Sequence, residues 1–242
     1  MTPARRDISK KLRILDYAKT IGNVAGKRAG KNPKIYQATL GLLKLVSRLD
    51  RGTMMAKKVL LLLGSPREKG NSAILAKQIA KGAKTAKAKV ETIYLHGKNI
   101  APCKACFACQ KKNSKGCSIQ DDMQEMYLKL IEADAWVIAS PVYWFTVSAQ
   151  TKIFMDRCFA LPAYRNDPFK GKRIAIAMAY GGDDPFDSGC VNALRTFQDA
   201  FAYKESDIIG MVYGSAMDAG EIKLNQKVMQ EAIELGKKLA SD

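Results

Sequence analysis

Histidine is nearly absent from the sequence, which contains His96 alone. A single imidazole excludes any multi-histidine metal site, and we find no plausible His-centred triad around it. Long apolar runs are missing too: the apolar run Val59–Leu63, for example, is far short of the roughly 20 residues that span a bilayer. The basic N-terminus is followed by neither an apolar signal region nor a small-residue cleavage site. We therefore expect a cytoplasmic protein, in which thiols stay reduced.

Acidic residues are scarce at the start of the chain. The 242 residues hold 40 Lys and Arg against 23 Asp and Glu, a net charge of +17, and residues 1–54 hold 13 of the basic and 3 of the acidic ones. Helical spacing of apolar residues on both sides of a Gly/Lys-rich break predicts that 1–54 is a basic helical extension. Packing on the main domain or on another subunit is the favoured role, and a DNA-binding arm is the alternative, so nucleic acid is an unlikely partner.

Short apolar runs alternate with amphipathic stretches from residue 55 to 242, which we predict to be one domain. This alternation favours α/β with a parallel sheet. Five strands fit a flavodoxin-like three-layer sandwich of strand order 2-1-3-4-5, whose ligand crevice lies at the carboxyl ends of strands 1 and 3. The predicted strands are 57–63, 89–95, 135–140, 173–179 and 206–212. The predicted helices are 72–86, 122–131, 148–159, 187–201 and 221–240.

The loop after the first strand has the composition of a phosphate site. It reads Gly-Ser-Pro-Arg-Glu-Lys-Gly-Asn-Ser and opens directly into a helix. Helix N-termini bind phosphate, and the loop adds side-chain donors from Ser65, Arg67, Asn71 and Ser72, with Gly70 in the turn. Because the dinucleotide spacing Gly-x-Gly-x-x-Gly is missing, a mononucleotide is favoured over a bound NAD. A plain turn capped by Asn71 or Ser72 is the alternative.

The loop after the third strand carries three consecutive aromatic residues. Consecutive side chains point in different directions, so a core cannot easily bury them all. A flat ligand explains them, with Pro141, Tyr143 and Trp144 as a wall beside an isoalloxazine ring; an oligomer interface is the alternative. The candidate ring-binding residues are Pro141, Val142, Tyr143, Trp144 and Phe145. After the fourth strand, Gly181 and Gly182 would let backbone approach the ring, although a simple turn explains them nearly as well.

Four of the six cysteines, Cys103, Cys106, Cys109 and Cys117, lie within fifteen residues. This crowding suits a cubane iron-sulfur cluster, because neighbouring ligands must reach different irons of one small object. Structural zinc fits less well, since its ligand pairs are usually separated by a longer arm. Cys158 and Cys190 are interpreted as packing residues.

Together these stretches resemble the iron-sulfur flavoproteins, within the NADPH-dependent FMN reductase superfamily. The resemblance covers about residues 56–242 and includes 64–72, the cysteine loop, 119–123, 140–143 and 148–157. It implies one FMN per subunit, a 4Fe-4S cluster on the four cysteines, and a homodimer or homotetramer in which flavin and cluster exchange electrons. The 54-residue extension has no counterpart in that pattern.

The function expected from this resemblance is FMN-dependent electron transfer between flavin, cluster and a carrier such as ferredoxin, with NAD(P)H as a candidate co-substrate. The basic surface would suit an acidic carrier. A cluster-free NAD(P)H-dependent FMN or quinone reductase is the alternative. A redox-sensing nucleic-acid-binding protein is the third hypothesis. No catalytic side chain is predicted, because the cofactors carry the chemistry.

Overall fold

A computed structural model describes residues 56–241 of the chain. The chain divides after Met55 into two units, one residue from the boundary that the sequence predicts. The predicted helical extension lies outside the described residues and stays a prediction. Within the described part, no helix is long and apolar enough to cross a membrane.

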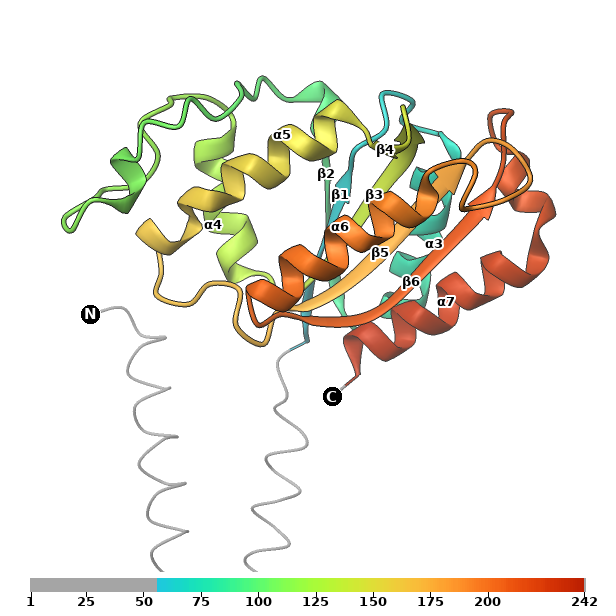
Figure 1. Cartoon of the computed structure of the whole chain (residues 1–242). Coiled ribbons are helices and arrows are strands. Elements are labelled where there is room, and N and C mark those ends of the chain that lie inside the picture. The colour runs from blue at the N-terminus through green and yellow to red at the C-terminus, as the bar shows by residue number, and fades with distance from the viewer. Residues whose placement is uncertain (1–55, 242) are drawn as a thin grey trace, which may run out of the picture. The chain divides into compact units, whose positions relative to one another are not determined.

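The domain is built on a parallel sheet of order β2-β1-β3-β5-β6, which confirms the flavodoxin-like class (Figure 1). It has one strand more than predicted, because the two-residue β4 pairs antiparallel with the end of β3. The fourth and fifth parallel strands are therefore numbered β5 and β6. The strands are β1 Lys58–Leu63, β2 Lys89–Tyr94, β3 Ala135–Tyr143, β4 Thr146–Val147, β5 Arg173–Tyr180 and β6 Asp207–Ser215.

Helices cover both faces of the sheet. The helices α4, α5 and α6 lie on one face and α3 and α7 on the other (Figure 1). They span α3 Asn71–Thr85, α4 Met123–Glu132, α5 Ala149–Arg157, α6 Cys190–Tyr203 and α7 Gln226–Ala240. Short 3₁₀ turns are η2 Leu95–Gly97, η3 Ala108–Gln110, η4 Cys158–Ala163 and η5 Glu221–Leu224.

The central strands are buried on both sides, as a parallel sheet between two helical layers requires. Alternate residues of β1 enter opposite cores: Leu60 and Leu62 pack with α4 and α6, whereas Val59 and Leu61 pack with α3 and α7. The nearly unbroken apolar run of β1 follows from this double burial.

One predicted helix ends earlier than expected and another begins later, and residues near each end explain the difference. The helix predicted over 148–159 ends at Arg157 and continues as the 3₁₀ turn η4, which holds Pro162. Proline lacks the N–H that a longer α-helix would need. The helix predicted from 221 begins at Gln226, because the Asn225 side chain accepts from the backbone N–H of Val228 at 3.1 Å. The turn η5 occupies the residues before it.

One serine joins the carboxyl ends of β1 and β3. Ser148 caps α5 by accepting from the backbone N–H of Thr151 and donates its hydroxyl to the Gly64 carbonyl at 2.7 Å. A Cβ at Gly64 would lie 1.9 Å from the Thr151 hydroxyl oxygen, so the close approach requires glycine. This contact brings together the two loops that the sequence singles out.

Candidate functional site

The loop after β1 leaves the start of α3 open. Gly70 stands at the N-cap position, and no side-chain hydrogen bond caps the helix. The alternative of a turn capped by Asn71 or Ser72 is therefore wrong. The hydroxyl of Ser72 is buried and lacks a hydrogen-bond partner among the described residues. The first N–H groups of a helix have no partner within it, so this end has the donors that a phosphate needs.

Two other residues of this loop have structural contacts. The Ser65 hydroxyl accepts from the backbone N–H of Arg67 at 3.0 Å, which shapes the turn. The Asn71 amide donates to the carbonyls of Ala216 and Asp218 and accepts from the backbone N–H of Gly220 at 2.9 Å. Asn71 therefore ties this loop to the loop after β6 instead of offering a free donor. Its contact with a phosphate stays a prediction, as do those of Ser65, Arg67, Gly70 and Ser72.

The aromatic residues after β3 form the tip of a tight hairpin. Tyr143 pairs with Thr146, and Trp144 and Phe145 between them have φ values of 49° and 63°. Left-handed backbone is costly for bulky residues and occurs mostly where the surroundings or a function impose it. None of the three aromatic side chains lies in the core, and Trp144 is 92% exposed. Pro141 and Val142 are half-buried at the base of the hairpin.

The glycines after β5 lie at the same edge of the sheet. Gly182 has a φ of 83°, and no atom lies within 4 Å of where a Cβ would be. Its carbonyl accepts from the Ser215 hydroxyl at the end of β6. Because β1, β3 and β5 are adjacent and parallel, the loops with Ser65, Trp144 and Gly181 share one edge of the sheet.

The four clustered cysteines line one cavity of about 120 Å³. Phe107 and Phe159 also line it, with ring centroids 6.0 Å apart in a T-shaped contact. Within residues 56–241, no group of three or more His, Cys, Asp or Glu side chains could hold a single metal ion. A cubane instead takes each thiolate on a different iron, so its ligands surround a volume. Four thiols around one volume have the arrangement that a cubane cluster uses, and a cluster here is a proposal.

The pKa of the Cys106 thiol is lowered, chiefly by the hydrogen bond with the Ser118 hydroxyl at 3.3 Å, with a smaller contribution from the charge of Lys104. Thiolates rather than thiols bind metals, so this environment favours ligation. By contrast, burial raises the pKa of Cys190 to about 12 and also raises the pKa of Cys158. Both are buried, as packing cysteines are.

The position of the cysteine cavity differs from our expectation. Because the loop follows the second strand, the strand order 2-1-3-4-5 predicts that it emerges at the carboxyl edge and holds a cluster on the flavin's side of the molecule. The loop does leave the end of β2, but its cavity is lined by Asp156, Arg157 and Phe159 at the far end of α5. The N-terminal end of α5, at Ser148, adjoins the phosphate and aromatic loops. A nine-residue helix is about 13 Å long, so the two sites lie apart within one chain.

A buried ion pair supports the cysteine loop. Arg157 donates to both carboxylate oxygens of Asp121, at 2.5 and 3.0 Å, and the two side chains are 1% and 5% exposed. The same guanidinium donates to the Ala101 carbonyl at 2.8 Å and lies 3.6 Å from the sulfur of Cys117. The ion pair therefore fixes both ends of the cysteine loop to α5.

Tyr164 and Gln124 hold the backbone of Cys117. The Tyr164 hydroxyl accepts from the N–H of Cys117 at 3.0 Å and donates to the Gln124 side-chain oxygen at 2.8 Å. Gln124 in turn donates to the Cys117 carbonyl at 3.1 Å. Sequence reasoning assigned no role to Tyr164, Gln124 or the Asp121–Arg157 pair. The only signal was that Asp121 and Arg157 lie in stretches that carry the family resemblance.

The fold and these loops define a class, the flavodoxin-like flavin oxidoreductases. The family described as NADPH-dependent FMN reductase matches residues 57–203. The chain is 37% identical over 153 residues to an iron-sulfur flavoprotein of Methanocaldococcus jannaschii, covering 63% of this chain and 75% of that one. An iron-sulfur flavoprotein of Archaeoglobus fulgidus is 42% identical over 120 residues, 50% of this chain and 60% of that protein. The chain belongs to the iron-sulfur flavoprotein family, although it spans less than two thirds of the Archaeoglobus relative.

Solved structures agree with the fold. An NAD(P)H:quinone oxidoreductase from Methanothermobacter marburgensis has a TM-score of 0.60 at 16% identity, covering 78% of this chain and 98% of that one. An FMN-dependent NADH-azoreductase from Bacillus anthracis, in complex with FMN, has a TM-score of 0.57 at 17% identity, covering 76% and 100%. At these identities the likeness concerns the fold alone.

Replacing Asp121 tests the role of the buried pair. Burial raises the pKa of Asp121, but the Arg157 guanidinium and two backbone N–H groups outweigh it and hold that pKa below its ordinary value. The stability from this carboxylate is therefore present above its unfolded pKa of about 4 and is lost as pH falls through the lower folded pKa. We expect Asp121→Asn to cost about 3–5 kcal/mol at pH 7, because it leaves a buried charge uncompensated.

The measurement is urea denaturation between pH 7 and pH 3. As pH falls below about 4, the free energy of unfolding should decrease less in the variant than in the wild type. Asp199→Asn is the matched control, because its 2.9 Å pair with Arg195 is exposed and worth well under 1 kcal/mol. Equal stability of the two variants would contradict the role given to Asp121.

Proposed function

We propose that this protein is an FMN-dependent electron-transfer oxidoreductase that passes electrons between FMN, a 4Fe-4S cluster and a carrier. The observation that carries this proposal is the gathering of Cys103, Cys106, Cys109 and Cys117 around one cavity in a flavodoxin-like domain. The cysteine loop is tied down by the Asp121–Arg157 pair, which is the preorganisation that a cluster site requires.

Each loop at the carboxyl edge has a part in holding the flavin. Ser65, Arg67, Gly70 and Ser72, with the N-terminal N–H groups of α3, bind the phosphate. Pro141 to Phe145 and the backbone at Gly181 and Gly182 line the ring. When bound, FMN exchanges electrons in pairs or singly, and the cluster exchanges them singly. No side chain has to act as a general base. NAD(P)H is a candidate reductant of the bound flavin.

The separation of the two sites along α5 favours an oligomer. If the cysteine cavity of one subunit faces the flavin loops of another, electrons cross the interface instead of the length of α5. The exposed hairpin with Trp144 and Phe145 suits such a contact, since Trp and Phe are enriched at interfaces. We therefore propose a homodimer or homotetramer.

Trp144→Ala tests whether the hairpin contacts the flavin ring, another subunit or both. If Trp144 covers the flavin ring, the FMN dissociation constant should rise about tenfold, because an aromatic contact of about 1 kcal/mol and its buried area are lost. Fluorescence titration of the apoprotein with FMN measures this, and sedimentation velocity measures the assembly. Leu128→Ala, at an exposed apolar position on α4, is the control. Unchanged FMN affinity with dissociation into monomers would assign Trp144 to the interface alone.

The cluster is tested by a metal and flavin count. After anaerobic purification, we expect one FMN and about four iron and four sulfide per subunit. Each single Cys-to-Ser change should remove most of the iron and leave the FMN, because flavin and cluster sites are built from different loops. The positions to change are Cys103, Cys106, Cys109 and Cys117. Cys190→Ala, at a buried cysteine on α6, should retain both.

Retention of FMN without iron, even after anaerobic cluster reconstitution, would reject the cluster. The cluster-free NAD(P)H-dependent FMN or quinone reductase would then be the function. The third hypothesis, redox sensing on nucleic acid, depends on residues 1–54 and would require DNA binding that is lost on their deletion.

The partner proposed for the cluster is an acidic electron carrier such as ferredoxin. With a net charge of +17, the protein attracts an anionic carrier at long range, and salt screens that attraction. We expect the rate of reduction by reduced ferredoxin to fall at least tenfold between roughly 50 and 500 mM NaCl. Reduction by a small uncharged reductant is the control and should barely change. A ferredoxin rate that does not depend on salt would reject electrostatic steering.

A further inference from the structure

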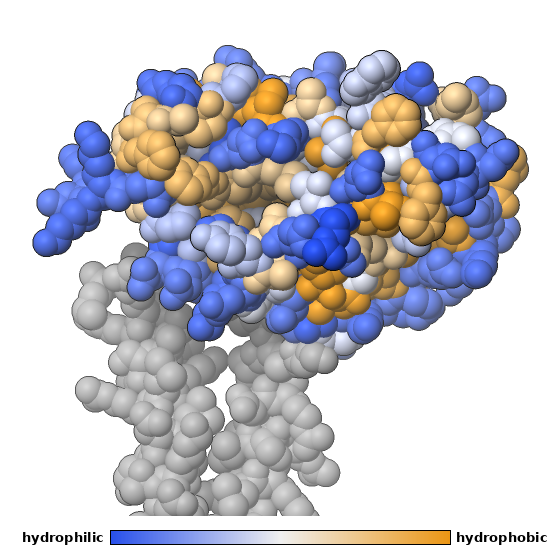
Figure 2. Space-filling view, viewed as in Figure 1, coloured by the Kyte–Doolittle hydropathy of each residue, from blue (hydrophilic) through white to orange (hydrophobic). Residues whose placement is uncertain are grey.

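A second, larger cavity lies between α5 and α6, away from the flavin loops. Its volume is about 500 Å³, within the range of small-molecule sites. On the face seen in Figure 2, apolar side chains gather around a hollow between these helices. Trp136, Phe154 and Phe201 form buried walls, and Phe159 and Tyr203 form the exposed rim. A cavity with this many rings favours a planar aromatic occupant.

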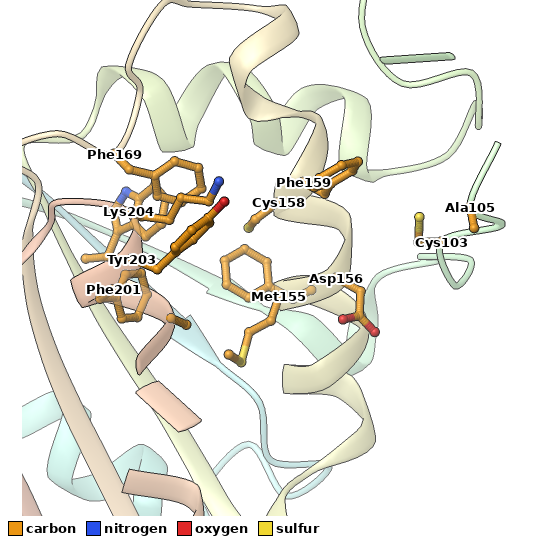
Figure 3. Close-up of a pocket in the computed structure, with 13 residues that line it drawn as sticks. Cys103, Ala105, Met155, Asp156, Cys158, Phe159, Phe169, Phe201, Tyr203 and Lys204 are labelled. Atoms are coloured by element: carbon orange, nitrogen blue, oxygen red, sulfur yellow. The ribbon is translucent and has the colours of Figure 1, made fainter. Parts of the chain in front are cut away.

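A cation stands at the mouth of this cavity. The Lys204 ammonium lies 4.8 Å from the ring centroid of Tyr203 and 5.8 Å from that of Phe169 (Figure 3). Among residues 56–241, no carboxylate forms an ion pair with it. The acidic side chain in the cavity lining, Asp156, is paired with Lys152 at 2.8 Å. The positive charge of Lys204 is thus left for a ligand.

We propose that this cavity binds a planar aromatic molecule that carries an anionic group, such as an aromatic carboxylate. The exposed rings of Phe159 and Tyr203 take the aromatic body, over a floor formed by the buried rings of Trp136, Phe154 and Phe201. Lys204 takes the anion at the rim, where a charge-assisted contact keeps some access to water. Nothing in this site overlaps the loops assigned to FMN.

The cavity also adjoins the cysteine loop. Cys103 and Ala105 line both this cavity and the smaller one around the four thiols, and Figure 3 shows them beside the end of α5. A ligand in the larger cavity therefore contacts the segment that carries a proposed cluster ligand. The binding proposal itself does not depend on the cluster, because the three buried rings of the cavity come from β3, α5 and α6.

Calorimetric titration of the full chain with 2-naphthoate tests the proposal. We expect one saturable site, and at least tenfold weaker binding in Ala200→Phe, because Ala200 lines the cavity and a phenyl group there fills it. Ala202→Phe makes the same change on the same helix at an exposed position that does not line the cavity, and should bind as the wild type does. The neutral analogue 2-naphthamide should bind at least tenfold more weakly than 2-naphthoate.

Lys204→Met is a second test that does not depend on the folding of Ala200→Phe, because the Lys204 side chain is partly exposed. It should weaken 2-naphthoate tenfold and leave 2-naphthamide within twofold, whereas Lys204→Arg should keep most of the affinity. Absence of saturable binding would overturn the proposal, as would equal effects of Ala200→Phe and Ala202→Phe. Iron and flavin contents are measured on the same samples, so loss of the cluster cannot be mistaken for loss of this site.

Discussion

The buried pair between Arg157 and Asp121 is the interaction on which the arrangement of the cysteines depends. Arg157 is the last residue of α5, and Asp121 lies just before α4. Their two hydrogen bonds join these helices, and the contacts to Ala101 and Cys117 bring the long cysteine loop into the same network. A buried charge is tolerated only when it is paired and hydrogen-bonded. Removal of either partner would therefore leave an unpaired charge in the interior and lower the stability of the fold.

The two proposed redox sites lie at opposite ends of α5. Ser148 at its start joins the loops for the flavin, and Arg157 at its end holds the loop for the cluster. One helix thus positions both sites and also keeps them apart. In this geometry assembly is part of the proposed function, since a neighbouring subunit can shorten the path that electrons take.

Much of the fold could be predicted from the chain because the signals are local. The run Val59–Leu63 and the β-branched and apolar residues from Ala135 onward predict buried strands, and the helices between them predict parallel pairing. Helix ends were predicted less well. The stop at Arg157 and the start at Gln226 depend on Pro162 and on the Asn225 cap, which shift boundaries by a few residues. The hairpin strand β4 was missed because the two residues that follow the aromatic positions are too few to show a periodicity.

By itself, the sequence determined the flavodoxin-like class, the family and the grouping of four cysteines, since each is written in contiguous residues. Only the tertiary structure decided where that group lies. It moved the cysteines from the flavin edge to the far end of α5, because the path of a long loop is set by contacts with residues distant in sequence, such as Arg157 and Tyr164. The structure also showed that the side-chain amide of Asn71 is hydrogen-bonded to carbonyls of the loop after β6. It placed the Lys204 ammonium beside the rings of an aromatic cavity. Both contacts join residues that only folding brings together.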